Sequence, residues 1–522
     1  MLLAALITLL VCAFACVAVQ SVYFVHMLQL NSYRPERYKR WCVGNERTLL
    51  RWTRLLPALL LAALYLPEAV ALWCGAGVLL LTALLNIPPK AKKKLVVTPR
   101  VRRLFTTLAL WYALVLGLCG GLYGFIGYMR CIGIAALFSL LPWLWVGLCN
   151  VVNTPLERRI SQKFTDEAVA ILRACPDLTV VGITGSYGKT SVKNFLHALL
   201  SARYQTLMTP ESFNTPMGVV RTVREQLRPS HEVFLVEMGA RQTGDIAELC
   251  ALARPRYGII ASVGEQHLET FGSVENVVAG KFELADAIPE DGCLFLNADN
   301  ALIREQMARM GDRPARITYG TAEGSDADYR ASDISVGRDG STFTVTAPDG
   351  SSARFTAKLL GAHNIQNLVG CIAVAHTLGI PLSELAYPVR LIKPVQHRLQ
   401  LLGNGFIDDA YNANPQGFRA ALDVLSAFEG VTRVLVTPGC VELGEQQDGI
   451  NRELGAYAAA RCDVAVLVGK RQAPPLQEGL LSAGFDPARL YVAEDLQDAL
   501  RYVSGIAAPR IVLLENDLPD NY

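Results

Sequence analysis

A chain of 522 residues is too long for one compact core, so we expect several domains. Its net charge of +2 hides a division: residues 1–152 hold fifteen Lys and Arg against three Asp and Glu, whereas the remainder holds 34 against 44. A basic, apolar first part and an acidic remainder predict two different solvents and give no reason to expect a nucleic-acid partner. The thirteen cysteines form no CxxC pair, so neither a zinc site nor a disulfide framework is predicted, and the acidic remainder is expected to be cytosolic and reduced.

Residues 1–152 are expected to form a transmembrane module. Residues 2–30 carry no charge and exceed the ~20 residues that a helix needs to span a bilayer. They lack a basic start and a cleavage site, so we expect an anchor and not a removed signal peptide. Two further apolar zones, residues 49–87 and 104–152, each suit two helices. The expectation is five spans, with four as the alternative.

Two basic segments predict how this module lies in the cell membrane. Residues 31–54 and 88–103 hold seven Lys and Arg each. Short loops this basic stay on the cytoplasmic side, so a multi-pass protein with cytoplasmic catalytic domains is predicted. The same charges attract anionic membrane lipid. A groove for a lipid-linked substrate is the open alternative.

The remainder is predicted to be α/β. Residues 153–177 are expected to form a linker helix, followed by a central domain over 178–393 and a C-terminal domain over 394–522. The expected central strands are 178–184, 232–238, 257–263 and 293–296, with helices between them, which is typical of a parallel sheet. Residues 332–358 predict an antiparallel flap, and 361–379 a helix. A Rossmann-like sheet is expected from strands at 405–407, 433–436, 464–468, 490–492 and 511–514.

The strongest chemical signal is a glycine-rich turn between an expected strand and an expected helix. Backbone N–H groups in such a turn hold phosphate oxygens, with Lys189 neutralising the β- and γ-phosphates and Thr190 binding Mg²⁺. Ile183 stands where the standard phosphate loop (P-loop) has a glycine, and a purely structural turn is the alternative. The residues expected to hold the nucleotide are Gly185, Ser186, Gly188, Lys189, Thr190 and Ser191.

The string Gly185-Ser186-Tyr187-Gly188-Lys189-Thr190 resembles the phosphate loop of the Mur ligases. Further matches follow in the family's order over roughly residues 178–445. They resemble most the MurF type, which adds D-Ala-D-Ala to UDP-MurNAc-tripeptide. The resemblance implies a central P-loop domain with a parallel sheet, a Rossmann-like C-terminal domain, and ATP and Mg²⁺ as cofactors.

The resemblance also assigns roles in the central domain. Glu237 of Glu237-Met238-Gly239-Ala240 would bind Mg²⁺, and His267 would bind a second metal ion. Lys281 resembles the lysine that is carbamylated in many members and then helps to hold that second metal; a solvated lysine is the alternative. Asn297 would contact adenine. The segment Gly361–Asn367 resembles the GxHNxxN motif, for which helix capping and function weigh equally.

The most family-specific string is Asp408-Asp409-Ala410-Tyr411-Asn412-Ala413-Asn414-Pro415, which resembles the DDxYNANP motif of the MurF type. By this resemblance Arg398 and Asp409 meet ATP when the domains close. Tyr411, Asn412 and Asn414 would lie near the incoming amine. The expected catalytic set is Lys189, His267, Lys281, Arg398 and Asp409.

These residues predict a ligase that activates a carboxylate as an acyl phosphate and joins it to an amine, an amino acid or a dipeptide, in peptidoglycan precursor or related cell-envelope peptide synthesis. Three features depart from the family: Tyr187 replaces an asparagine, transmembrane helices replace the domain that grips the UDP-sugar, and Glu515-Asn516-Asp517 stands where the MurF type has Lys-Gly-Ser. The donor is therefore expected to be a UDP-linked or lipid-linked muramyl peptide. The alternatives are a catalytically silent nucleotide-binding scaffold and a transport ATPase, although no ABC-type signature is present.

Overall fold

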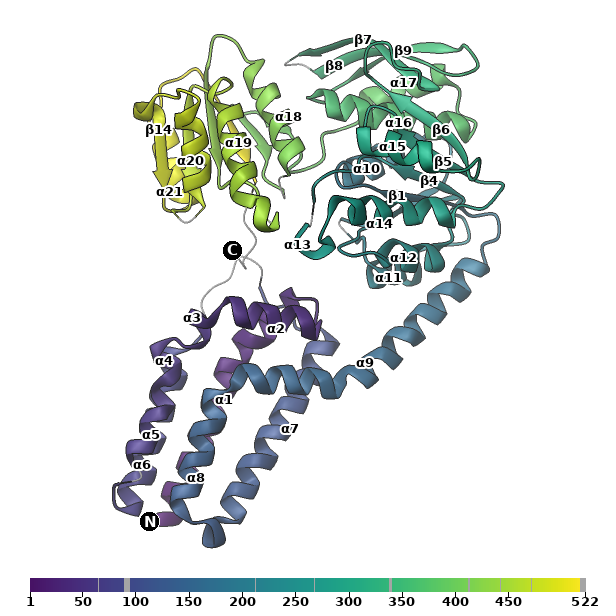
Figure 1. The fold of residues 1–522 in the computed structure, drawn as a ribbon. Coiled ribbons are helices and arrows are strands. Elements are labelled where there is room, and N and C mark those ends of the chain that lie inside the picture. The colour runs from purple at the N-terminus through teal and green to yellow at the C-terminus, as the bar shows by residue number, and fades with distance from the viewer. Residues whose placement is uncertain are drawn as a thin grey trace. The chain divides into compact units, whose positions relative to one another are not determined.

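The computed structural model describes residues 1–63, 65–88, 94–211, 213–266, 268–337, 340–411, 414–441, 443–470 and 472–516. Two predicted site residues, His267 and Asn412, therefore lie outside the described residues. The chain forms two compact units, Met1–Lys163 and Phe164–Tyr522, and each is described by itself (Figure 1). The first is helical and the second is α/β with two sheets, which confirms the predicted fold class.

Apolar helices make up the first unit. Four helices in its described part are long and apolar enough to cross a membrane: α1 (Leu2–Leu30), α6 (Glu68–Leu85), α7 (Pro99–Gly121) and α8 (Tyr123–Leu140). A shorter apolar segment precedes α6 and consists of α4 (Trp52–Leu55), η1 (Leu56–Leu59) and α5 (Leu60–Ala63). The links from α1 to this segment are α2 (Pro35–Gly44) and α3 (Glu46–Leu49). By helix length and composition, the number of candidate spans in the described residues is four, which is the alternative that the sequence left open beside five.

Hydrogen bonds show which helix ends of this unit lie together. At one end of the unit, where the chain leaves α1, three side chains donate hydrogen bonds to backbone carbonyls. They are Gln29 to Val96 at 2.9 Å, Asn86 to Thr53 at 3.0 Å, and Tyr38 to Trp143 at 3.0 Å. At the opposite end Tyr123 hydrogen-bonds Glu68. The chain therefore runs along the bundle five times, with residues 52–63 as the short second pass. Residues 31–54 and the described residues 94–103 share the end at which α9 (Pro142–Arg173) begins.

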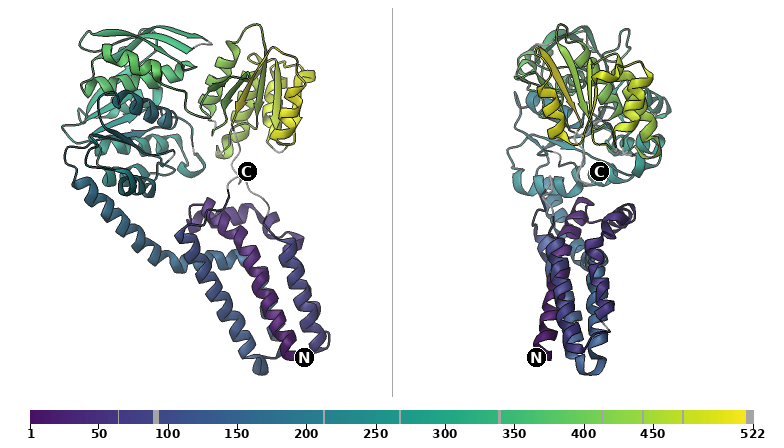
Figure 2. Two further views of the ribbon diagram at one scale, coloured as in Figure 1. Left: turned by 180° about the vertical axis from the view of Figure 1, so that it is seen from behind. Right: turned by 90° about the vertical axis from the view of Figure 1, so that its left-hand side faces the viewer.

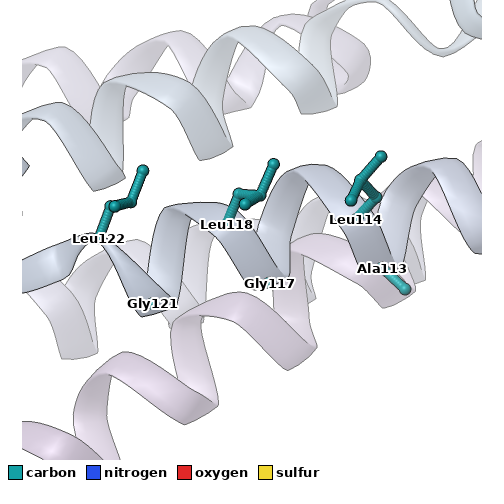
Figure 3. Close-up of a pocket in the computed structure, with 6 residues that line it drawn as sticks. All are labelled: Ala113, Leu114, Gly117, Leu118, Gly121 and Leu122. Atoms are coloured by element: carbon teal, nitrogen blue, oxygen red, sulfur yellow. The ribbon is translucent and has the colours of Figure 1, made fainter.

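A shallow groove runs along α7 and is lined only by apolar residues (Figure 3). Its lining residues are Ala113, Leu114, Gly117, Leu118, Gly121 and Leu122. The small residues recur every four positions and so share one helix face, beside leucines that are about half exposed. Such a face suits lipid or another helix. It offers no polar group to a substrate.

The larger sheet of the second unit has nine strands in the order β2-β3-β1-β4-β5-β6-β7-β8-β9. Its parallel strands are β1 (Thr179–Thr184), β2 (Thr206–Met208), β3 (Val233–Glu237), β4 (Tyr257–Ile260), β5 (Cys293–Asn297) and β6 (Ala315–Gly320). The four predicted strands are present, whereas β2 and β6 were not predicted. Val181 and Val180 belong to different apolar clusters, because successive side chains of β1 point to opposite faces of the sheet.

Helices cover both faces of this sheet (Figures 1 and 2). They are α10 (Lys189–Leu200), α11 (Pro216–Gln226), α12 (Asp245–Ala253), α13 (Leu268–Phe271), α14 (Val274–Ala287), α15 (Ala301–Arg309), α16 (Ala362–Thr377) and α17 (Leu382–Leu391). Strand β1 pairs with β3 on one side and with β4 on the other, so the strand order reverses at β1. A ligand crevice is expected outside the carboxyl ends of parallel strands at such a reversal of strand order.

The predicted flap is present as β7 (Tyr329–Gly337), β8 (Gly340–Thr346) and β9 (Ser352–Ala357), which pair antiparallel. It is not a separate element, because β7 pairs with β6 and so extends the nine-stranded sheet. The predicted linker helix is longer than expected. Helix α9 begins at Pro142 and passes through Pro155, so residues 142–152 belong to it and not to a membrane span.

The second sheet has six strands in the order β10-β11-β15-β12-β13-β14. They are β10 (Gln400–Leu402), β11 (Phe406–Asp409), β12 (Thr432–Thr437), β13 (Val464–Val468), β14 (Leu490–Ala493) and β15 (Arg510–Glu515). The helices α18 (Pro415–Ser426), α19 (Gln447–Ala459), α20 (Ala473–Ser482) and α21 (Leu496–Ser504) follow the strands. All five predicted strands are present and parallel, and β10 adds an antiparallel edge.

Candidate active site

The phosphate loop connects β1 to α10 in the conformation that the glycines predict. Gly185 has φ 150° and Gly188 has φ 78°, a region that L side chains seldom adopt. A Cβ on Gly185 would lie 3.0 Å from the Ser262 carbonyl oxygen, and one on Gly188 would lie 2.6 Å from the Asn367 amide oxygen. Both glycines are therefore required by conformation and by space.

Lys189 begins α10 and turns back over the loop. Its ammonium donates to the carbonyls of Gly185 at 2.7 Å and Ser186 at 3.1 Å. Burial lowers the pKa of Lys189 to about 8; the Glu237 charge opposes this shift, and the Arg398 charge adds to it. The amine is thus held at the site where phosphate oxygens would replace the carbonyls. Ser191, in the first turn of α10, is buried.

Ser186 and Tyr187 tie the loop to the segment after β4. The Ser186 amide donates to the Ser262 carbonyl at 2.7 Å, and its hydroxyl donates to the Gly264 carbonyl at 3.0 Å. The Tyr187 hydroxyl donates to the Glu265 carbonyl at 2.6 Å. Tyr187, where the resembling motif has asparagine, is therefore a structural contact to the segment that leads to His267.

Glu237 ends β3 and forms the most buried polar cluster near the loop. Its Oε1 accepts from the Thr190 hydroxyl and from the Asn214 amide, each at 3.2 Å. Its Oε2 lies 2.9 Å from the Lys193 ammonium, and both side chains are 1% exposed. Lys193 also donates to the Glu211 carbonyl. Lys193 was not among the predicted site residues, although its position one turn after Lys189 on an apolar helix face was a signal.

Lys281 lies on α14 with a side chain that is 1% exposed. Burial lowers its pKa well below the ordinary value; the Lys189 charge acts in the same direction, and the Asp245 and Glu283 charges oppose it. Its ammonium position lies 5.8 Å from the centre of the Phe271 ring. The solvated lysine considered above is therefore wrong.

Asn297 lies at the end of β5, as predicted, but its side chain is engaged by the backbone. It donates to the Ala261 carbonyl at 3.0 Å and accepts from the Asp299 amide at 3.0 Å. Asp299 in turn accepts from Thr321 and from the Gln366 amide at 2.8 Å. This link between β5, β6 and α16 was not predicted.

The GxHNxxN segment opens α16 without a side-chain cap, so the capping interpretation is wrong. Asn364 instead donates back to the Leu360 carbonyl at 2.9 Å. Asn367 lies against Gly188 of the phosphate loop. Burial lowers the pKa of His363 to about 4, so its imidazole is neutral at pH 7. The segment therefore supports the loop from the adjoining helix.

In the C-terminal domain Arg398 donates to the Tyr411 carbonyl at 3.1 Å, with its guanidinium 4.5 Å from the centre of the Tyr411 ring. Asp409 accepts from the Leu399 amide at 3.0 Å. Asn414 caps α18 by accepting from the Gly417 amide at 2.7 Å, a structural role. Tyr411 is 45% exposed and free to meet a ligand. The structure thus brings together Arg398, Asp409 and Tyr411.

Comparisons with known proteins agree with this geometry. The family model of the Mur ligase middle domain matches residues 183–375, and that of the Mur ligase, glutamate ligase domain matches residues 397–515. A UDP-N-acetylmuramoyl-tripeptide–D-alanyl-D-alanine ligase of Bacillus subtilis is 33% identical over 341 residues, which cover 64% of this chain and 72% of that protein. The enzyme of the same name from Escherichia coli is 34% identical over 310 residues, covering 58% and 68%.

Solved structures agree as well. A MurF crystal structure from Acinetobacter baumannii has a TM-score of 0.61 and 27% identity, and the match covers 68% of this chain and 77% of that one. A MurF ligase from Thermotoga maritima, solved in complex with ADP, has the same fold with a TM-score of 0.60. The family matches start at residue 183, after the helical unit. The chain belongs to the Mur ligase family and is an ATP-dependent ligase that resembles the MurF type.

Proposed function

We propose that this chain is a membrane-held ligase that activates the carboxylate of a muramyl peptide with ATP and joins it to an amine, with D-Ala-D-Ala as the first candidate. The observation that carries the proposal is the Lys189 amine, which turns back onto the carbonyls of a phosphate loop whose next residue, Thr190, contacts Glu237 at 3.2 Å. The relatives named above are D-alanyl-D-alanine ligases, which supports the choice of amine.

The residues present suit Mg²⁺ at the first metal site. The Thr190 hydroxyl and Glu237 Oε1 are hard oxygen donors that already lie together, and Mg²⁺ takes few protein ligands of this kind. When bound, the ion would neutralise negative charge on the phosphate oxygens. A second metal site would need His267, which lies outside the described residues, and Lys281. Within the described residues no group of three or more His, Cys, Asp or Glu side chains is arranged to hold a metal ion.

The chain's own residues act by positioning and by charge. Lys189 would hold the β- and γ-phosphate oxygens in place of its two carbonyl contacts. Arg398 would bring a second cation from the C-terminal domain, and Asp409 would orient it. The carboxylate becomes an acyl phosphate when it takes the γ-phosphoryl group, and attack by the amine expels phosphate. Closure of the two domains would keep water from this intermediate.

The amine is proposed to enter beside Tyr411 and Asn412. Tyr411 presents an exposed ring next to Arg398, which suits a small peptide that carries its own carboxylate. Asn414 would contribute through the helix end that it caps. The reaction needs no nucleophile from the protein, because the phosphoryl group supplies the activation.

The carboxylate donor is proposed to be presented at the membrane on a lipid carrier. Four of the described helices have the length and composition to span a bilayer, and residues 31–54 and 94–103 lie at the bundle end from which α9 leaves. Basic residues at that end would lie at the level of anionic head groups. A soluble UDP-linked donor is the alternative substrate of the same site.

Consumption of ATP by the full chain in detergent tests the function. ADP release that depends on a muramyl peptide and D-Ala-D-Ala, and that disappears in Lys189→Ala, is the expected result. Lys470→Ala, which removes an exposed amine of the C-terminal domain, is the matched control and should retain the rate. Nucleotide binding without turnover on any donor and amine would instead identify a scaffold.

A further inference from the structure

Two carboxyl groups meet at the end of the C-terminal sheet. Strands β11 and β15 run parallel, and Asp409 is paired with Glu515. Both side chains therefore point to the same face of the sheet, at the carboxyl ends of the two strands. Glu515 is 1% exposed. Glu515 Oε2 is buried without a hydrogen-bond partner, and Asp409 is the carboxyl beside it on the paired strand. Two carboxylates cannot hydrogen-bond each other, because neither has a hydrogen to donate, so a hydrogen bond between these groups requires one proton between them.

The strand end that carries Glu515 is firmly fixed. Asn516 has φ 69°, a left-handed conformation that asparagine tolerates better than most residues. Its side-chain amide donates to the Gly439 carbonyl at 2.6 Å, and its backbone amide donates to the Asp409 carbonyl at 3.2 Å. Glu515 therefore has little freedom to turn away from Asp409.

Four charged or titratable groups of the described residues bear on this pair. Arg398 is the cation that acts on both carboxyls. Asp408 adds a carboxylate that lies 2.7 Å from the His397 ring nitrogen, and the Cys440 thiol is buried next to Glu515. One cation thus faces two buried acids. With a proton shared between them, the acids and Arg398 balance to zero charge.

We propose that Glu515 is a positioning residue, which shares one proton with Asp409 so that Arg398 faces a single negative charge and remains free to bind the nucleotide. This inference rests on the proposed function, because it takes Arg398 as a phosphate ligand. Loss of the shared proton would leave Arg398 between two carboxylates. It would then be held more strongly by the protein, and the added negative charge would repel the triphosphate.

The direction of the pH effect follows from the same contacts. Burial raises the pKa of Asp409 to about 6 against the Arg398 charge, and burial next to Asp409 raises the pKa of Glu515 well above its ordinary value. The folded pKa values exceed the unfolded ones, so the stability that the shared proton contributes is present at low pH. It is lost as pH rises through the folded values. Nucleotide affinity should fall over the same range.

Binding of ADP to the full chain in detergent, measured by calorimetry from pH 5.5 to 8.5, tests this. The affinity of the unmodified chain should fall roughly tenfold more across the range than that of Glu515→Gln, the scale of one added charge in a screened site. Comparing the two proteins at each pH cancels the titration of ADP itself. Glu515→Lys, which gives Asp409 a cation in place of a proton, should resemble Glu515→Gln and serves if that variant fails to fold. The control Glu494→Gln, at an exposed ion pair, should follow the unmodified chain.

The melting temperature without nucleotide is a second measurement. It should fall more steeply with rising pH in the unmodified chain than in either Glu515 variant. Parallel melting curves in all proteins, or equal pH dependence of ADP binding, would overturn the inference. Absence of ADP binding by the unmodified chain at every pH would overturn the proposed function, and the melting curves would still decide whether the proton is shared.

Discussion

At the scale of single residues, the ion pair between Lys193 and Glu237 has the most measurable consequence. Both side chains are 1% exposed, and the pair holds Glu237 where its other oxygen meets Thr190. Removing one partner of a buried pair leaves an uncompensated charge, which costs about 3–5 kcal/mol. We expect Lys193→Met to lower the melting temperature by at least several degrees and to weaken Mg²⁺-dependent nucleotide binding.

An exposed pair of the same type gives the control for Lys193→Met. Lys470 and Glu494 lie 2.6 Å apart but are 71% and 72% exposed, so Lys470→Met should cost no more than about 1 kcal/mol. Equal melting temperatures for the two methionine variants would show that the pair to Glu237 is not formed in solution.

Lys281 is expected to react with carbon dioxide. Because burial lowers its pKa well below the ordinary value, more of this amine is neutral than in an exposed lysine. The nitrogen would bond to the carbon of CO₂ and release one proton to water, leaving an anionic carbamate. ¹³C-labelled bicarbonate should give a carbamate resonance in the unmodified chain and not in Lys281→Met, which keeps the side-chain length. A spectrum without that resonance in both proteins would refute the modification.

Residue types at strand ends and loops were predictable, but their hydrogen-bond partners were not. Lys189, Thr190 and Glu237 followed from a motif that fixes the backbone. Lys193 was missed because a lysine is seldom fully buried, although the helix face on which it lies is apolar. Asn297 and Asn414 were predicted as ligand contacts, and the structure has both bound to the backbone, a competition that sequence spacing does not show.

At the scale of elements, the phosphate loop and α16 are expected to act together. A Cβ on Gly188 would meet the Asn367 side chain at 2.6 Å, and φ 78° disfavours any L side chain. Gly188→Ala should therefore weaken nucleotide binding at least tenfold through both effects. Adding Asn367→Ala should relieve the clash but not the backbone strain of roughly 1–2 kcal/mol. We expect the double variant to recover part of the affinity in a titration.

The control for Gly188→Ala and the double variant is Gly182→Ala. Gly182 lies in β1, and its added Cβ would meet the flexible side chains of Leu284 and Met238 and not the loop. It should reduce stability more than nucleotide affinity. A double variant no better than Gly188→Ala would mean that strain alone accounts for the loss and that α16 does not support the loop.

Long, strongly patterned elements were predictable and short edge elements were not. The strands that form the centre of both sheets are continuous apolar runs, which buried parallel strands require. The three-residue strands β2 and β10 have too few residues for any periodicity. Helix α9 was cut short in the prediction because the residues before Pro155 are apolar and were assigned to a span.

At the scale of the whole molecule, the number of passes would decide on which side the catalytic domains lie if the helical unit spans a membrane, as we propose. The hydrogen bonds between helix ends require five passes within the first unit, although the second, residues 52–63, is short. Because the number of passes is odd, residues 31–54, residues 94–103 and the start of α9 lie at the same end of the bundle. The short second pass and α6 both lie in the apolar zone 49–87, in which the sequence predicted two helices, although the first of them is shorter than a span requires.

The helical unit should matter for the donor and not for the nucleotide. If the donor is carried on a lipid, holding the ligase in the same bilayer raises its effective concentration without any new contact. We expect the full chain in lipid vesicles to process a lipid-linked muramyl peptide at least 100-fold faster than the fragment 153–522 does. Both proteins should bind ADP with equal affinity, because the phosphate loop and both sheets lie after residue 163. Equal rates on a soluble UDP-linked donor, together with no gain on the lipid-linked one, would show that the helices are an anchor unrelated to the substrate.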